Sequence, residues 1–185
     1  MISAKIDADN LPDYYKALYK LQADVHSPSY LLVHDEIRNR LIDCESYTEM
    51  GINQGATLAA AILQNPKQVR AYDIKLGWYL EAQQLFENYA HDNNISYKVF
   101  EMDTLECVIE PTDLLYIDTL HRYDHLTKEL RRHANKVNKY IIFHDTHAMK
   151  GLKRAVNEYV DQNPSWSIIT DCVENVGFMT IERHK

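Results

Sequence analysis

Short apolar segments alternate with amphipathic helical segments from residue 46 onward, and this alternation constrains the fold more than any other feature of the chain. Strands that are joined through helices pack as a parallel sheet, with helices covering both faces. The pattern therefore predicts an α/β fold with a Rossmann-like, doubly wound and mostly parallel sheet. The predicted strands are SYTEMG (46–51), VRAYDI (69–74), SYKVFEMD (96–103), DLLYID (113–118), YIIFHD (140–145), WSIITDC (166–172) and GFMTIER (177–183).

Helices are predicted before and between these strands. DLLYID and YIIFHD are apolar without strict alternation, which is typical of central strands buried on both faces. The short stretch VENV (173–176) separates the last two strands and predicts an antiparallel C-terminal hairpin.

We expect a single domain, in which residues 1–46 form an N-terminal helical segment and residues 47–185 form the α/β part. The predicted helices span 13–25, 29–44, 56–65, 78–92, 124–137 and 150–163.

Charge and composition exclude several classes of protein. Lys and Arg number 20 and Asp and Glu 27, a net charge of −7, which is unsuited to coating a phosphate backbone. The one basic cluster, 128–139, is typical of a solvated helix, so we expect no nucleic-acid partner. No run of apolar residues is long enough for a membrane span, and the polar N-terminus does not resemble a signal peptide. We therefore expect a cytoplasmic protein without a membrane partner, with its three scattered cysteines reduced.

Four predicted strands end in an acid. Asp73, Asp103, Asp118 and Asp145 stand at the carboxyl ends of their strands, and histidines surround the last two of these acids. Open α/β sheets bind their ligands at this edge, because the carboxyl ends of parallel strands meet there. The sequence therefore places a polar ligand site at one edge of the sheet.

A glycine-containing segment, TEMGINQGAT (48–57), joins the first predicted strand to a helix. Gly51 and Gly55 permit tight turns and close approach of a ligand, and the following helix offers free N–H groups. Asp73 comes 18 residues after Gly55, at a position where an acid can bind ribose hydroxyls. The dinucleotide-binding pattern GxGxxG is not met, because Asn53 occupies the second glycine position. Glycines that only shape a turn, and acids that only cap the next helix, remain alternatives.

The segment Glu49-x-Gly51-x-Asn53-x-Gly55 resembles the first motif of class I S-adenosylmethionine-dependent methyltransferases, E-x-G-x-x-x-G. This resemblance implies S-adenosylmethionine as the cofactor. It also implies that Asp73 binds the ribose and that Asp103 lies near the adenine. The cofactor-binding residues implied in this way are Glu49, Gly51, Asn53, Gly55, Asp73 and Asp103.

The segment IDTLHRYD (117–124) resembles the I-D-G-x-H-x-Y-E signature of one branch of these enzymes. That branch contains the sugar O-methyltransferases of the macrocin and mycinamicin type and the cephalosporin hydroxylase-like proteins. FHDT (143–146) is similar to the H-D-T that ends the fifth strand there, and the similarity extends over roughly residues 45–183. The chain departs from the pattern at Thr119, where Gly is usual, and at 137–139, where a Pro-Gly-Gly turn is missing.

This resemblance implies a divalent cation, usually Mg²⁺, at the acids that end the fourth and fifth strands. Asp118 and Asp145 could reach one ion if their strands are neighbours, since adjacent strands lie about 4.8 Å apart. His144 is a candidate third ligand, and an imidazole would shift the preference toward a transition metal. His121 is implied as the general base and Asp118 as a catalytic residue beside it. His125 and His147 are interpreted as surface or helix-capping residues.

The resulting prediction is an enzyme, a metal-dependent O-methyltransferase acting on a small hydroxylated acceptor such as a sugar diol or a catechol. The N-terminal helical segment, 1–46, is a candidate lid over that acceptor. Its tyrosines, with Tyr15 and Tyr19 among them, are interpreted mainly as packing residues. An iron- and 2-oxoglutarate-dependent hydroxylase, or a non-catalytic S-adenosylmethionine-binding protein on the same fold, are the alternatives. The sequence is compatible with a homodimer but contains no signal that requires one.

Overall fold

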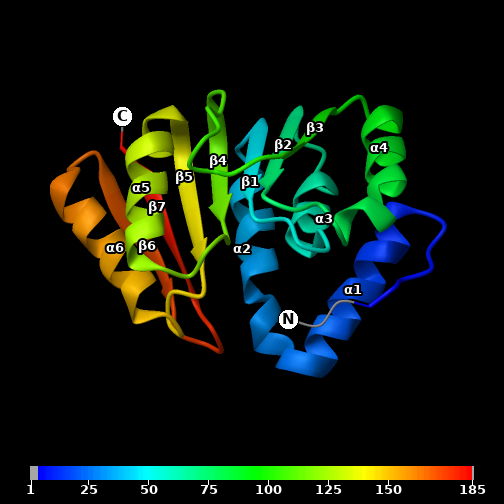
Figure 1. Cartoon of the computed structure of the whole chain (residues 1–185), viewed down its shortest axis with the longest axis horizontal. Helices are drawn as coiled ribbons and strands as arrows, with labels where there is room; N and C mark the ends of the chain where they lie inside the picture. The colour runs from blue at the N-terminus through cyan, green and yellow to red at the C-terminus, as the bar shows by residue number, and fades with distance from the viewer. Residues whose placement is uncertain (1–3, 185) are drawn as a thin grey trace.

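The computed structural model describes residues 4–184, which form a seven-stranded sheet flanked by helices (Figure 1). The strand order is β3-β2-β1-β4-β5-β7-β6. The first five strands run parallel, whereas β7 is antiparallel to both β5 and β6. The strands are β1 (Ser46–Met50), β2 (Gln68–Asp73), β3 (Ser96–Glu101), β4 (Thr112–Ile117), β5 (Val137–His144), β6 (Trp166–Cys172) and β7 (Phe178–Arg183).

Helices cover both faces of the sheet. One hydrophobic cluster joins the first four helices to one face, and a second cluster joins the last two helices to the other. The α-helices are α1 (Leu11–His26), α2 (Leu32–Leu41), α3 (Ala56–Ile62), α4 (Gln83–Asp92), α5 (Tyr123–His133) and α6 (Lys150–Gln162). Three 3₁₀ turns complete the fold, η1 (Pro28–Leu31), η2 (Tyr79–Glu81) and η3 (Ala134–Lys136).

This architecture confirms the predicted doubly wound sheet, the antiparallel C-terminal hairpin and the N-terminal helices. Several boundaries differ from the prediction, and the largest difference is at α4, which begins at Gln83 rather than at the expected residue 78. β5 begins at Val137, three residues earlier than expected, because Val137 is fully buried and pairs with Thr112 of β4. The helix expected over 124–137 is therefore shorter, and η3 makes the turn into β5.

The N-terminal helices pack onto the sheet rather than forming a separate unit. Leu11, Leu18 and Ile37 belong to the same buried cluster as Tyr47 of β1. Figure 1 shows α1, η1 and α2 meeting below the lower edge of the sheet, where the arrowheads of β4 and β5 point. The segment from α1 to α2 thus reaches the carboxyl edge of the parallel strands.

The corner between α1 and α2 is fixed by contacts to the C-terminal hairpin. Asn175, in the β6–β7 turn, donates from Nδ2 to the carbonyl oxygen of His26 at 2.8 Å and to Oγ of Ser27 at 2.9 Å. Pro28 then starts η1 with a preset φ angle. Within residues 4–184, no helix has both the length and the apolar character needed to cross a bilayer.

Candidate functional site

A cavity of about 550 Å³ opens at the carboxyl edge of the sheet. This volume lies within the range of small-molecule sites, roughly 300–1,000 Å³. Loops from the sheet form one half, which we call the sheet-edge half. α1, η1 and α2 form the other half, which we call the helix-lined half. The sheet-edge half contains Gly51, Ile52, Asn53, Asp73, Ile74, Asp103, Thr104, Leu105, Leu120 and His125, and the helix-lined half contains Leu18, Leu21, Gln22, His26, Tyr30, Val33 and His34.

The loop after β1 requires glycine at two positions. Gly51 has a φ of +90°, and a Cβ atom there would lie 2.0 Å from the carbonyl oxygen of Asp118. Gly55 has a φ of +80°, and a Cβ atom there would lie 2.9 Å from the ring of Phe86. Asn53 also has a positive φ, +49°. The loop therefore passes close to the end of β4, and it exposes its backbone to the cavity as a ligand-binding loop must.

The carboxylate of Asp73 is bound to this loop as well as lining the cavity. Its Oδ2 accepts from the backbone N–H groups of Ile52 at 2.7 Å and Asn53 at 3.1 Å. Asp103 also lines the cavity, and its Oδ1 accepts from the N–H of Leu105 at 2.8 Å. Both acids therefore hold loop backbone in place, and both also present carboxylate surface to the cavity.

Glu49 lies beneath the loop and does not line the cavity. It is fully buried and accepts hydrogen bonds from the hydroxyl of Tyr47 at 2.5 Å and from that of Thr57 at 2.8 Å. Burial raises the pKa of Glu49 to about 8, although both hydroxyl bonds act in the opposite direction. Glu49 therefore connects β1 to the first turn of α3 and can act on a ligand only through the loop.

A cluster of two acids and two imidazoles stands where β4 and β5 end. Ile117 of β4 pairs with Phe143 of β5, so the next residues, Asp118 and His144, are direct neighbours. Asp145 follows with a φ of +58°, a left-handed conformation uncommon for a residue with a side chain. Nε2 of His121 lies 3.2 Å from Oδ1 of Asp118 and 2.9 Å from Oδ2 of Asp145, so the imidazole bridges both acids.

Electrostatic coupling within this cluster is strong. Burial opposes ionisation of Asp118, but the nearby imidazoles of His144 and His121 outweigh it and hold the pKa of Asp118 well below its usual value. Hydrogen bonds to Asp118 and Asp145 raise the pKa of His121 to about 10. Burial lowers the pKa of His144, but Asp118 outweighs this effect and the net shift is upward. The carboxylates of Asp118 and Asp145 thus favour a positive charge in the space between them.

The donor atoms of this cluster fit a divalent cation. Asp118, His121 and Asp145 each offer one ligand atom, and these three atoms lie within 4.8 Å of one another. His144, which the sequence suggested as the third ligand, is 4% exposed, and its Nδ1 has no hydrogen-bond partner among the described residues. That atom lies 3.4 Å from Oδ2 of Asp118 and 3.6 Å from Oδ1 of Asp145. Two carboxylates with an unpaired buried imidazole nitrogen beside them form an oxygen- and nitrogen-rich site of the kind that binds Mg²⁺ or Mn²⁺.

The sequence interpretation was wrong for His125. His125 is not a surface residue, because it lines the cavity, and its Nε2 lies 3.2 Å from the fully buried carboxylate of Glu129. Glu129 also accepts from the hydroxyls of Thr104 at 2.5 Å and Thr119 at 2.9 Å. The signal that could have found this pair is the i,i+4 spacing of a histidine and a glutamate on one helix. His147 is exposed, as expected.

Comparisons with known proteins identify the fold. No known family model matches the sequence, and no curated protein matches it. Solved structures do match. The N-methyltransferase NodS from Bradyrhizobium japonicum WM9, in complex with S-adenosyl-L-homocysteine, has a TM-score of 0.67 at 12% identity, covering 96% of this chain and 100% of NodS. The O-methyltransferase TomG from Streptomyces achromogenes, in complex with SAM, has a TM-score of 0.66 at 12% identity, covering 97% and 92%.

A third structure gives the same result. The O-methyltransferase from Bacillus cereus, in complex with SAH, has a TM-score of 0.62 at 13% identity and covers 96% of this chain and 92% of that one. At such low identity the likeness establishes the fold alone, which this chain shares with these three methyltransferases.

Proposed function

We propose that this protein is an S-adenosylmethionine-dependent O-methyltransferase that uses a divalent cation and acts on a small hydroxylated acceptor. One observation supports this more than any other. The acid–imidazole cluster reaches the same cavity as the glycine loop, through Asp118 and His144. Because Gly51 lies against the backbone of Asp118, a cofactor bound on the loop would lie beside the cluster.

In this proposal the cofactor occupies the sheet-edge half of the cavity. The loop 51–55 approaches the cofactor through its backbone, and Asp73 accepts hydrogen bonds from the ribose hydroxyls. Asp103 and His125 line the part of the cavity next to Thr104 and Leu105, where the adenine would lie. All three structures compared above are methyltransferases described in complex with SAM or SAH, which supports this choice of cofactor over the hydroxylase alternative.

Asp118 and Asp145 would hold the cation, with His144 as a nitrogen ligand. Mg²⁺ is the expected ion, and an imidazole in the ligand set would also suit Mn²⁺. A bound divalent cation would neutralise the two carboxylates and lower the pKa of a hydroxyl group that binds to it.

His121 is proposed as the general base. Its Nε2 faces both carboxylates, and its side chain is 34% exposed, although His121 itself is not among the residues that line the cavity. The two carboxylates are the groups that raise the pKa of His121 to about 10. Once their charge is compensated, the imidazole loses this support and can take the acceptor proton near neutral pH. The acceptor oxygen then attacks the methyl carbon as the bond from that carbon to the sulfonium sulfur breaks.

The acceptor in this proposal carries two adjacent oxygens, as a sugar diol or a catechol does, because such a pair can chelate one cation. The motif around IDTLHRYD favours the branch of sugar O-methyltransferases of the macrocin type. A catalytic role is favoured over simple cofactor binding, because a binding protein does not require Asp118, His121 and Asp145 in one cluster.

The proposal is tested by calorimetric titration of S-adenosylhomocysteine, with and without Mg²⁺, followed by titration of Mg²⁺ and Mn²⁺ alone. We expect micromolar binding of S-adenosylhomocysteine and saturable binding of at least one cation. Failure of S-adenosylhomocysteine to bind in either condition would overturn the cofactor assignment. Failure of both cations to bind would overturn the metal assignment while leaving the cofactor intact.

A further inference from the structure

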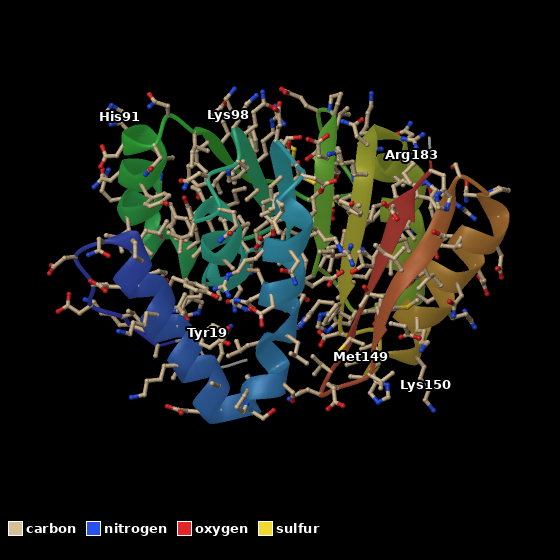
Figure 2. All side chains as sticks on the ribbon, turned by 180° about the vertical axis from the view of Figure 1, so that it is seen from behind. Tyr19, His91, Lys98, Met149, Lys150 and Arg183 are labelled. Carbon is tan, nitrogen blue, oxygen red and sulfur yellow. The ribbon has the colours of Figure 1, made fainter. Side chains whose placement is uncertain are left out.

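The helix-lined half of the cavity contains a histidine whose ring orientation is set by two neighbours. His34, on α2, is 1% exposed and lines the cavity. Its Nδ1 lies 3.0 Å from the hydroxyl of Tyr15 on α1. Tyr19, labelled on α1 in Figure 2, packs edge-on against the same imidazole, with ring centroids 5.9 Å apart. The imidazole therefore has little freedom to rotate.

These neighbours also determine which nitrogen of His34 carries the proton. Arg38 donates from Nη2 to the hydroxyl oxygen of Tyr15, and arginine has no acceptor to offer in return. Among the described residues, Nδ1 of His34 is the only acceptor near the proton of the Tyr15 hydroxyl, so we assign this proton to the bond with Nδ1. Burial, together with the charges of Arg38 and His144, lowers the pKa of His34 to about 3, so the ring is neutral. A neutral imidazole that accepts at Nδ1 donates at Nε2, and no described residue hydrogen-bonds to Nε2.

The helix-lined half offers no lysine or arginine to an anionic ligand. No lysine or arginine is among the residues that line the cavity within the described part of the chain. Arg38 is directed away from the cavity, toward Tyr15 and toward Asp35, whose Oδ1 it contacts at 2.9 Å. Burying a carboxylate or a phosphate without a cationic partner is strongly unfavourable. A neutral oxygen, in contrast, needs only a donor such as Nε2–H.

We propose that the helix-lined half binds an uncharged acceptor, and that Nε2–H of His34 donates a hydrogen bond to a further oxygen on it, beyond the pair of hydroxyls near Asp118 and Asp145. This inference rests on the proposed function, since it assigns the acceptor to the half of the cavity that the cofactor leaves free. It excludes phosphorylated, nucleotide-linked and carboxylate-bearing acceptors. His34 is a specificity residue in this scheme, and Tyr15 and Arg38 position it.

The test uses two pairs of probes in which an uncharged amide replaces the carboxylate of its partner at the same position. They are protocatechuamide against protocatechuate, and glucuronamide against glucuronate, with catechol as a probe that lacks the further oxygen. Binding is measured by calorimetry on protein saturated with S-adenosylhomocysteine and Mg²⁺. We expect at least one amide to bind about tenfold or more tighter than its carboxylate partner. Equal or tighter binding of both carboxylates overturns the inference, and so does failure of all five probes to bind.

Variants at position 34 test the hydrogen bond itself. His34→Phe should weaken binding of the preferred amide about tenfold, the effect of losing one hydrogen bond to a buried group, and should leave catechol affinity unchanged. His34→Gln can place an amide N–H near the position of Nε2 and should recover part of the loss. An equal loss of affinity for catechol and for the amide would assign His34 a purely structural role and overturn the inference.

Two further readouts separate this inference from the proposed function and from misfolding. S-adenosylhomocysteine affinity should be the same in the wild type and in both variants, because His34 lies outside the sheet-edge half. Nitrogen chemical shifts of the histidines in the wild-type protein should show His34 protonated at Nε2 only, and Tyr15→Phe should abolish that preference. A wild-type His34 protonated at Nδ1 would overturn the inference without any variant, whatever the outcome for the cofactor.

Discussion

The two halves of the cavity are built by different means. In the sheet-edge half, backbone geometry places the polar groups, since Asp73 is the last residue of a parallel strand and Asp103 and Asp118 closely follow the ends of two others. In the helix-lined half, packing between α1 and α2 places them, and Tyr15 and His34 meet across 19 positions of sequence. The first arrangement suits a ligand that is common to many enzymes of one fold, whereas the second can change with the acceptor.

The largest expected effect is at Asp118, where the two halves meet. Asp118→Asn should weaken binding of Mg²⁺ or Mn²⁺ by at least about 100-fold, since even outer partners of metal ligands contribute 10–100-fold. Methyl transfer should be lost with it, while S-adenosylhomocysteine affinity stays near the wild-type value. Asp124→Asn is the matched control, because this exposed acid pairs only with Arg122 among the described residues. Metal binding that survives Asp118→Asn would remove this residue from the cation site.

A smaller but still large effect is expected from one added methyl group on the glycine loop. Gly51→Ala would bring Cβ within 2.0 Å of the Asp118 carbonyl oxygen at a φ of +90°. We expect a loss of about 3 kcal/mol in the free energy of unfolding, from backbone strain and overpacking together. Gly77→Ala is the control, because its Cβ would meet nothing within 4 Å. Chemical denaturation of both variants measures the difference, and similar stability in the two would show that the loop is not constrained by the end of β4.

Removing the Asp73 carboxylate should weaken ligand binding mainly in the sheet-edge half. Asp73→Ala should weaken S-adenosylhomocysteine binding by about 1–3 kcal/mol, because the ribose and the N–H groups of Ile52 and Asn53 lose their acceptor. Calorimetry measures the change, with Asp92→Ala at the exposed end of α4 as the control. Probe binding to the helix-lined half should change far less than cofactor binding. Unchanged cofactor affinity would exclude Asp73 from the cofactor site.

The last effect concerns the support beneath the loop, and it depends on pH. The pKa of Glu49 is raised to about 8 in the folded protein, above the ordinary value of 4.5 that the unfolded chain has. The folded state therefore binds the proton more tightly, so the contribution is fully present below pH 4.5 and is lost as the pH rises to about 8. This group alone should lower the free energy of unfolding by about 1.4 kcal/mol per pH unit across that window.

Glu49→Gln should remove this dependence, since the amide is neutral at every pH and still accepts from the hydroxyl of Tyr47. The difference in unfolding free energy between wild type and variant, measured by denaturation from pH 5 to pH 8, isolates the contribution of Glu49. The wild type should be relatively more stable at the acid end of this range. A difference that does not change with pH would show that Glu49 is already ionised in the folded protein.

The sequence by itself determined the sheet, the order of helices and strands, and the edge at which the acids gather. Alternating segments dictate a parallel sheet, and a parallel sheet brings all strand ends to one edge, so Asp73, Asp103, Asp118 and Asp145 could be located from spacing alone. The roles suggested for them remain predictions. The predicted start of β5 and the predicted end of α5 were less accurate, because both depend on the burial of Val137 against its neighbours.

Only the tertiary structure decided which side chains meet across that edge. Contacts such as His121 with Asp145, and Tyr15 with His34, depend on how loops and helices are oriented, which hydrophobic periodicity does not encode. The i,i+4 spacing of His125 and Glu129 was visible in the sequence, but its burial against the cavity was not. Periodicity records which face of an element is buried, whereas hydrogen bonds between distant residues depend on the angle and distance at which those faces pack.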